Sequence, residues 1–84
     1  MSTRVAVIAI IVEDQSSVGV INTLLHDASA YVIGRMGVPY RERGISIISV
    51  ALDAPQDVIS ALSGRIGALP GVSTKTAYSN IVTD

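Results

Sequence analysis

The chain has 84 residues, no cysteine and a formal net charge of −1. This length suits one small domain, and the lack of cysteine excludes disulfides and thiolate-bound zinc or iron–sulfur clusters. The near-zero charge and a pI of about 5.6 give the domain no overall attraction for a nucleic-acid backbone. Because no stretch approaches the roughly 20 apolar residues of a membrane span and no secretory signal pattern is present, we expect a cytoplasmic protein.

The composition is unusually apolar for a small domain. Apolar residues make up 49% of the chain and charged residues 15%, against a usual charged share of about 25%. One small core cannot hide that much apolar surface. Part of it is therefore expected to contact another copy of the protein.

The first half of the chain predicts a strand, a helix and a second strand. Residues 4–12 (RVAVIAIIV) are rich in β-branched residues and indicate a strand buried on both faces. Ser16 or Ser17 can cap a helix over residues 18–29. Residues 31–38 predict the second strand. The apolar face of the helix consists of Ile21, Leu24, Leu25 and Ala28.

The second half predicts a strand, a helix and a final strand. After a polar connection, residues 45–52 (ISIISVAL) indicate a third strand that is apolar on both faces. Asp53 is expected to cap a second helix, with Pro55 in its first turn and Gly67 at its end. Residues 72–79 predict a more polar fourth strand, and residues 79–84 a tail. The apolar face of the second helix consists of Val58, Ile59, Leu62 and Ile66.

This order of elements predicts an α+β, ferredoxin-like βαββαβ fold, as a single domain over residues 1–84. The fold has a four-stranded antiparallel sheet with two helices on one face, and its first and third strands are central. Two helices cover only one face, yet both central strands are apolar on both faces. An uncovered apolar face usually marks an interface. We therefore expect a homodimer or homotetramer formed through the open sheet face.

A G-x-x-G pattern at Gly34–Gly37 raises the question of RNA binding. The sequence IGRMG over residues 33–37 matches the loop with which a KH domain clamps nucleotide backbone. That loop must lead directly into a helix, whereas Pro39 and Gly44 follow here. RNA binding is therefore the least favoured interpretation. Two glycines in an edge strand more simply permit a bulge or a close backbone approach.

Three arginines surround these glycines. Arg35, Arg41 and Arg43 could hold a carboxylate or phosphate group. The alternative, which we favour, is a solvated hairpin whose charges discourage edge-to-edge aggregation. Glu42 partly neutralises the cluster.

Residues for metal binding or catalysis are few. His26 is the only histidine, and it lies on the polar face of the predicted first helix. The serines have no obvious partner base beyond it, and the chain has no cysteine nucleophile. We expect no metal site, no cofactor and no enzymatic activity.

Two blocks of the sequence carry a family resemblance. RVAVIAIIVED (residues 4–14) and the stretch from YVIGRMGVPYRERG to GVSTKTAYS (residues 31–79) resemble the iron-only hydrogenase system regulator family. Its members are ACT-like domains of ferredoxin fold, related to the C-terminal domain of nickel-responsive regulators. The most specific parts are IGRMGVPYRERGISIISV and DAPQDVISALSGRIGALPGVSTKTAYS.

The resemblance implies a regulatory protein, an oligomeric ligand-sensing module linked to the hydrogenase system. In ACT-type domains effectors bind near the turn after the first strand, at a subunit interface. By that analogy the candidate ligand-binding residues are Glu13, Asp14, Gln15 and Ser16.

Two departures from the related regulators narrow this expectation. The first strand begins by Arg4, with no helix-turn-helix before it, and the chain lacks the histidines and cysteine of a nickel sensor. Direct DNA binding and nickel sensing are therefore not expected. The alternative function is a structural protein–protein interaction module that binds no ligand.

Overall fold

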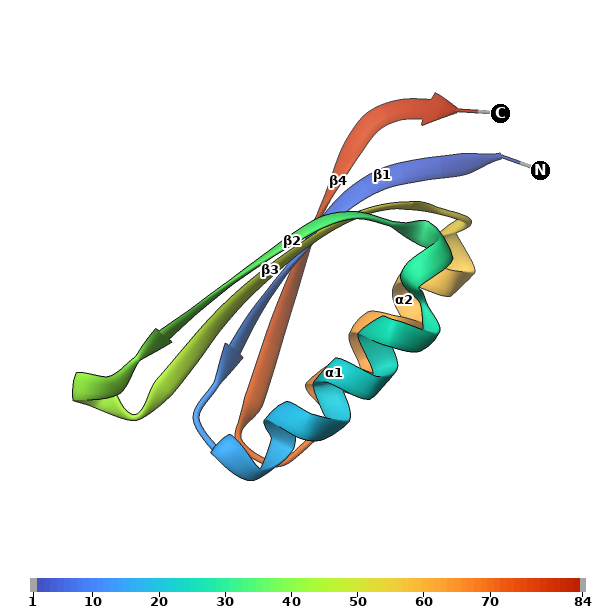
Figure 1. Ribbon diagram of the computed structural model, residues 1–84. Helices are drawn as coiled ribbons and strands as arrows, with labels where there is room; N and C mark the ends of the chain where they lie inside the picture. The colour runs from blue at the N-terminus through green and yellow to red at the C-terminus, as the bar shows by residue number, and fades with distance from the viewer. Residues whose placement is uncertain (1, 84) are drawn as a thin grey trace.

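The computed structural model describes residues 2–83, with side chains to residue 81. Its four strands and two helices follow one another in the order β1-α1-β2-β3-α2-β4 (Figure 1). Short 3-10 turns connect several of them. The elements are β1 (Thr3–Val12), α1 (Val18–Asp27), β2 (Val32–Tyr40), β3 (Ile45–Ala54), α2 (Gln56–Gly67) and β4 (Val72–Thr83).

The strands form one antiparallel sheet in the order β2-β3-β1-β4, so β1 and β3 are central as predicted. Both helices lie on the same face of this sheet (Figure 1). The predicted α+β, ferredoxin-like fold is confirmed. None of the helices within residues 2–83 is long and apolar enough to cross a membrane.

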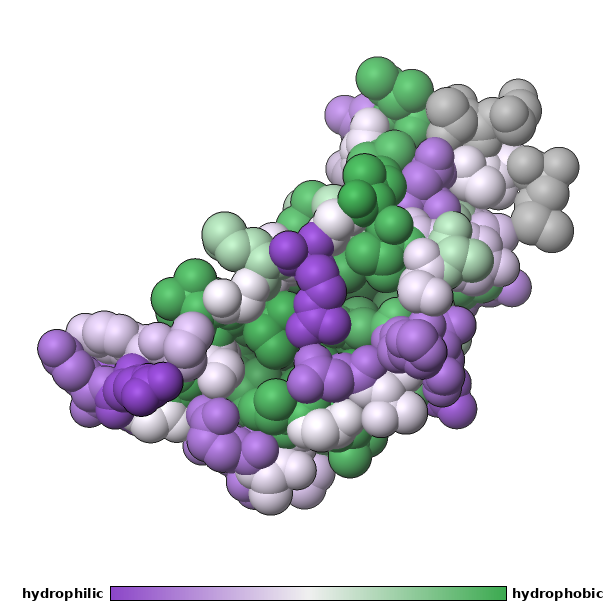
Figure 2. All heavy atoms as spheres, in the orientation of Figure 1, coloured by the Kyte–Doolittle hydropathy of each residue, from purple (hydrophilic) through white to green (hydrophobic). Residues whose placement is uncertain are grey.

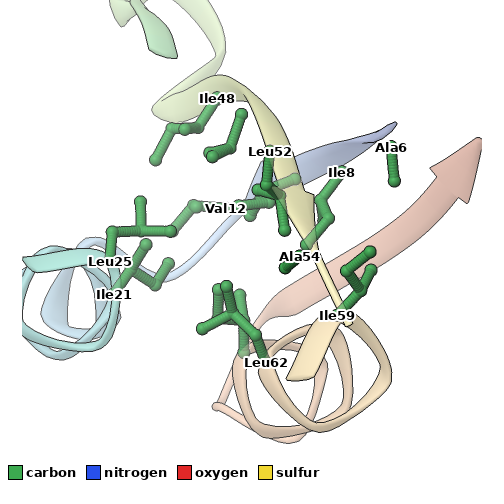
Figure 3. Close-up of a cluster of buried hydrophobic side chains, with 13 residues drawn as sticks. Ala6, Ile8, Val12, Ile21, Leu25, Ile48, Leu52, Ala54, Ile59 and Leu62 are labelled. Carbon is green, nitrogen blue, oxygen red and sulfur yellow. The ribbon is translucent and has the colours of Figure 1, made fainter. Parts of the chain in front are cut away.

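The core lies between the helices and one face of the sheet. Alternate residues of β1 and β3 point into it, where they meet Ile21 and Leu25 of α1 and Ile59 and Leu62 of α2 (Figure 3). Both predicted helix faces are confirmed, with Leu24, Ala28 and Val58 partly buried at the margin of the core. The strand residues of the core are Ala6, Ile8, Ile10, Val12, Ile48, Val50, Leu52 and Ala54.

The predicted cap of the second helix is wrong. Asp53 lies within β3, and α2 starts after Pro55, where no side chain caps the helix. Strand β3 continues because Ala54 is buried in the core and pairs with Arg4 of β1. Pro55 has a φ of −56°, and its carbonyl accepts the first helical hydrogen bonds from Val58 and Ile59.

The tail predicted over residues 79–84 is also wrong as far as residue 83. Strand β4 continues to Thr83, which pairs with Thr3 of β1. Arg4 supports this extension, since its Nη2 donates to the carbonyl of Ser79 at 2.9 Å and its guanidinium lies 4.8 Å from the ring centroid of Tyr78. Asp84 lies outside the described residues.

Strand β2 contains a bulge. Val32 lies opposite Leu52 and Gly34 lies opposite Ala51, so Ile33 is one extra residue on β2. After the bulge the strand alternates regularly. Arg35, Gly37 and Pro39 then lie on the helix side of the sheet, because their partners on β3 point to that side.

Candidate functional site

The turn after β1 holds the predicted effector-binding residues, and several of its polar groups form hydrogen bonds within the protein. The Oδ1 atom of Asp14 accepts hydrogen bonds from the backbone N–H of Ser16 at 2.9 Å and from its hydroxyl at 2.6 Å. The hydroxyl first, and the backbone N–H second, lower the pKa of the Asp14 carboxyl from its usual 3.8. Asp14 and Ser16 therefore stabilise the 3-10 turn at Gln15–Ser17.

The same turn is fixed to the loop before β4. The backbone N–H of Glu13 donates to the carbonyl of Gly71 at 2.7 Å. Ser17 is buried and its hydroxyl donates to the carbonyl of Pro70 at 2.8 Å, so its side chain does not cap α1. The backbone of this turn is thus held from both sides.

Gln15 reaches instead across to the β2–β3 hairpin. Its Nε2 donates to the carbonyl of Gly44 at 3.1 Å, and its Oε1 accepts from the Ser46 hydroxyl at 3.2 Å. These contacts form one wall of a hollow of about 380 Å³ at the hairpin end of the sheet. The hollow is lined by Gln15, Pro39, Arg41, Gly44, Ile45 and Ser46.

A second hollow, of about 200 Å³, continues the first along the helix side of β2. Both are lined by Pro39 and Ser46, and together they form what we call the α1–β2 groove. Arg35 lies at the other end of the groove, where its Nη2 donates to Oδ1 of Asn22 at 3.0 Å. The second hollow is lined by Val18, Asn22, Arg35, Gly37, Val38, Pro39, Ser46 and Ile48.

The structure thus brings together residues from both of the predicted sets. Gln15, Arg35 and Arg41 line the groove, whereas the third predicted arginine, Arg43, lines neither hollow. Sequence reasoning missed several lining residues, among them Pro39 and Ser46. The spacing Arg35, Gly37, Pro39 was the available signal, since alternate residues of a strand share a face.

The glycine pattern does not form a nucleotide clamp. Gly34 and Gly37 both lie within β2, which continues to Tyr40 before a 3-10 turn at Arg41–Arg43. A KH loop leads into a full helix, and none follows here. The interpretation of the two glycines as strand residues is therefore confirmed.

The face of the sheet opposite the helices is apolar and uncovered in the single chain. Its β2 and β3 residues include Met36, Val38, Tyr40 and Ile47, each at least 39% exposed, and β1 adds Val7 at 40%. We call this surface the open face. Val5, Ile11 and Ile45 extend it as half-buried residues.

Comparison with known proteins places the chain in a family. Residues 4–76 match the model of the TM1266-like family, described as "Iron-only hydrogenase system regulator, putative". The chain belongs to this family. The structure of TM1266 from Thermotoga maritima superposes with a TM-score of 0.86 at 35% sequence identity, over 90% of this chain and 96% of that one. The comparison with curated proteins gave no match.

Two more distant structures share only the fold with this TM1266-like chain. A formyltetrahydrofolate deformylase from Pseudomonas putida KT2440 has a TM-score of 0.67 at 17% identity, over 92% of this chain but 30% of the enzyme. A protein of unknown function from Galdieria sulphuraria has a TM-score of 0.63 at 20% identity, over 94% of this chain and 46% of its own. Neither likeness carries a function to this chain.

The titratable residues of this TM1266-like chain are scattered. His26 is exposed in the last turn of α1. Within residues 2–83, no three histidine, aspartate or glutamate side chains lie together in an arrangement that could hold a metal ion.

Proposed function

We propose that this chain is a non-enzymatic regulatory module that acts as a homo-oligomer assembled on its open face. A small effector bound at the hairpin end of the sheet would shift the oligomeric or partner-binding state. Membership of a family of hydrogenase system regulators supports the regulatory role. The observation that carries the proposal is the open face itself.

The open face carries a row of exposed or half-buried apolar side chains. Along β1 it presents Val5, Val7, Ala9 and Ile11, and the facing positions on β3 include the apolar Ala51 and Ile47. Charged side chains stand only toward its margins, at Asp53 of β3 and Lys75 of β4. Contiguous exposed apolar patches of this kind mark interaction sites.

A second copy of the chain is the occupant that fits. Four strands spaced about 4.8 Å apart, each about 27 Å long, give a face of about 500 Å² and a dimer burying on the order of 1,000 Å², about the minimum for a biological interface. Two such faces pack as a sheet-on-sheet sandwich. Because most soluble homo-oligomers are two-fold symmetric, one self-complementary face is sufficient for a dimer.

The effector part of the proposal rests on the hollow beside the β1–α1 turn. Gln15 contributes to it from the turn, and Arg41 from the hairpin. The amide of Gln15 and the guanidinium of Arg41 favour a ligand that forms hydrogen bonds and carries charge. A scaffold without any ligand is the competing function.

Light scattering over a protein concentration series tests the assembly. We expect a dimer or tetramer at micromolar concentration, and a monomer would overturn the proposal. Thermal unfolding in the presence of small-molecule panels separates sensor from scaffold, because a ligand at 100 times its dissociation constant stabilises by about 2.7 kcal/mol. A stable oligomer that no small molecule stabilises would favour the scaffold.

A further inference from the structure

We infer that the α1–β2 groove binds a small organic anion, with a carboxylate or phosphate group held by Arg41 or Arg35 and an apolar body lying on Val18 and Ile48. This inference rests on the proposed effector-dependent function and assigns the chemical class of the effector. It also extends the site from the β1–α1 turn along the helix side of β2.

The charged side chains that line the groove are all positive. Arg35 and Arg41 line it, and no carboxylate does. Glu42, the nearest acidic residue in sequence, accepts a hydrogen bond from the Tyr40 hydroxyl at 3.3 Å, and Tyr40 belongs to the open face. No carboxylate in the lining of the groove therefore competes with an incoming anion for the two arginines.

The arginines keep donors available. Arg35 is positioned by Asn22, which accepts from one Nη2 and leaves the other guanidinium N–H groups unused by that contact. Arg41 forms no side-chain hydrogen bond or ion pair with any residue in the described part of the chain. A guanidinium presents its donors in a planar fork that matches a carboxylate or a phosphate group.

The groove is open because position 37 has no side chain. A Cβ built on Gly37 would meet no atom within 4 Å, so the space beside it is empty. Gly37 does not have a positive φ, which means that larger residues can adopt its backbone conformation. The neighbouring walls are apolar at Val18, Pro39 and Ile48, which suits a ligand with a hydrocarbon part.

The groove stays accessible in the proposed oligomer. Among the lining residues, Val38 and Ile45 also belong to the open face, whereas Arg35, Gly37 and Pro39 lie on the helix side. Assembly through the open face therefore covers one side of the strand and leaves the groove on the other. A ligand in the groove would contact the helix side of β2, while the other side of the same strand forms part of the proposed interface.

The test uses three probes and NMR of the amide groups of the full chain. The probes are 4-methylpentanoate, its neutral amide 4-methylpentanamide, and inorganic phosphate. We expect the two anions to shift the amides of Gln15, Gly37 and Ser46, and the neutral amide to leave them unchanged. Binding of phosphate but not of 4-methylpentanoate, or the reverse, would identify the acidic group to which the arginines bind.

Four variants locate the site. Arg41→Gln and Arg35→Gln show which arginine holds the anion: at least one of the two is expected to weaken binding by about tenfold or more, the effect of one charge-assisted hydrogen bond. Arg43→Gln is the matched control outside the groove and should bind as the original chain does. Gly37→Val fills the groove and should abolish binding of 4-methylpentanoate.

Three results would overturn the inference: no shift at groove amides with either anion, an equal response to the neutral amide, or a loss in Arg43→Gln as large as the larger of the losses in Arg41→Gln and Arg35→Gln. Light scattering on the same samples separates this failure from that of the proposed function. An intact oligomer without anion binding removes the inference alone, whereas a monomer removes the proposed assembly.

Discussion

Gly71 brings the loop before β4 into backbone contact with the β1–α1 turn. Its φ is +67°, a left-handed conformation that side chains rarely adopt. A Cβ on Gly71 would lie 2.6 Å from Cβ of Asp14 and 2.8 Å from its backbone nitrogen. The position of the turn that holds Gln15 therefore depends on a missing side chain in another loop.

Three Gly→Ala variants separate backbone strain from this contact. Gly44 has a positive φ and open space around it, so Gly44→Ala should lower the free energy of unfolding by about 1 kcal/mol through backbone strain alone. Gly71→Ala adds the clash with Asp14 and should cost about 2–4 kcal/mol. Gly19→Ala, in open space within α1, should stabilise by up to about 1 kcal/mol. Urea unfolding at one fixed protein concentration measures all three.

Equal losses in Gly71→Ala and Gly44→Ala would contradict this account. They would mean that the turn moves away from the added methyl group at no cost, and that Gly71 matters only through its φ.

Asp14 provides a prediction about pH. Because its pKa is lowered in the fold, its contribution to stability is present above the usual value of 3.8 and is lost as the pH falls through the lower folded value. Ser16→Ala removes the larger cause, the hydroxyl, and should raise the pKa of Asp14 part of the way back toward 3.8. Ser60→Ala, on the exposed side of α2, should leave it unchanged.

NMR titration of the side-chain carboxyl carbon of Asp14 measures this directly. If Ser16→Ala left the titration where it was, the hydroxyl contact would not be formed in solution.

At the scale of single residues, the sequence located the turn but not the role of each residue in it. Asp14 and Ser16 bond to each other two residues apart, a local pattern that Asp and Ser often form in turns. Gln15 bonds to Gly44 and Ser46, which are 29 and 31 residues away. No local pattern reveals such a partner, because it depends on how the hairpin packs against the turn.

At the scale of elements, hydrophobic periodicity was sufficient for the fold. Within residues 2–83 it identified both α-helices and the four strands, and the central position of β1 and β3, since those strands are apolar on both faces. It failed at element ends. Asp53 is a good capping residue, yet pairing of the strand through Ala54 prevailed over that local preference. The polar end of β4 is likewise ordered by Arg4 and by pairing with β1.

Strand β2 was the element hardest to interpret from sequence. Nearly all of its residues are exposed in the single chain, so burial gives it no pattern. Its two sides nevertheless differ in chemistry, with Met36 and Val38 on one and Arg35 on the other. The side of the molecule that carries β2 shows hydrophobic atoms interrupted by hydrophilic side chains, and the hairpin end is largely hydrophilic (Figure 2).

At the scale of the whole molecule, the two faces of the sheet differ in what covers them. One face packs against both helices, and the other meets no part of the described chain (Figure 1). A charge at the centre of the open face should therefore affect assembly, while a charge on the outer side of a helix should not.

Val7 and Val20 offer a matched pair for this test. They are 40% and 46% exposed, but Val7 lies on the open face and Val20 on α1. Val7→Lys should dissociate the proposed oligomer, because its interface would have to bury an unpaired ammonium group, and a loss of at least about tenfold in association is expected. Val20→Lys should assemble as the original chain does.

Light scattering gives the masses, and circular dichroism confirms that both variants are folded. A folded Val7→Lys variant that remained fully oligomeric would show that the copies associate through another surface, such as the strand edges.

The bulge at Ile33 also has a consequence for chain length. Because Ile33 is the extra residue on β2, its deletion would turn the bulge into a regular ladder and keep every later side chain on its present side. Deletion of one residue further along, such as Met36, would turn the side chains before or after the deletion to the opposite face of the sheet. Arginine would then replace hydrophobic groups on the open face. Members of the family can thus differ in length by one residue at position 33 at little cost, whereas beyond it insertions and deletions in β2 should come in pairs.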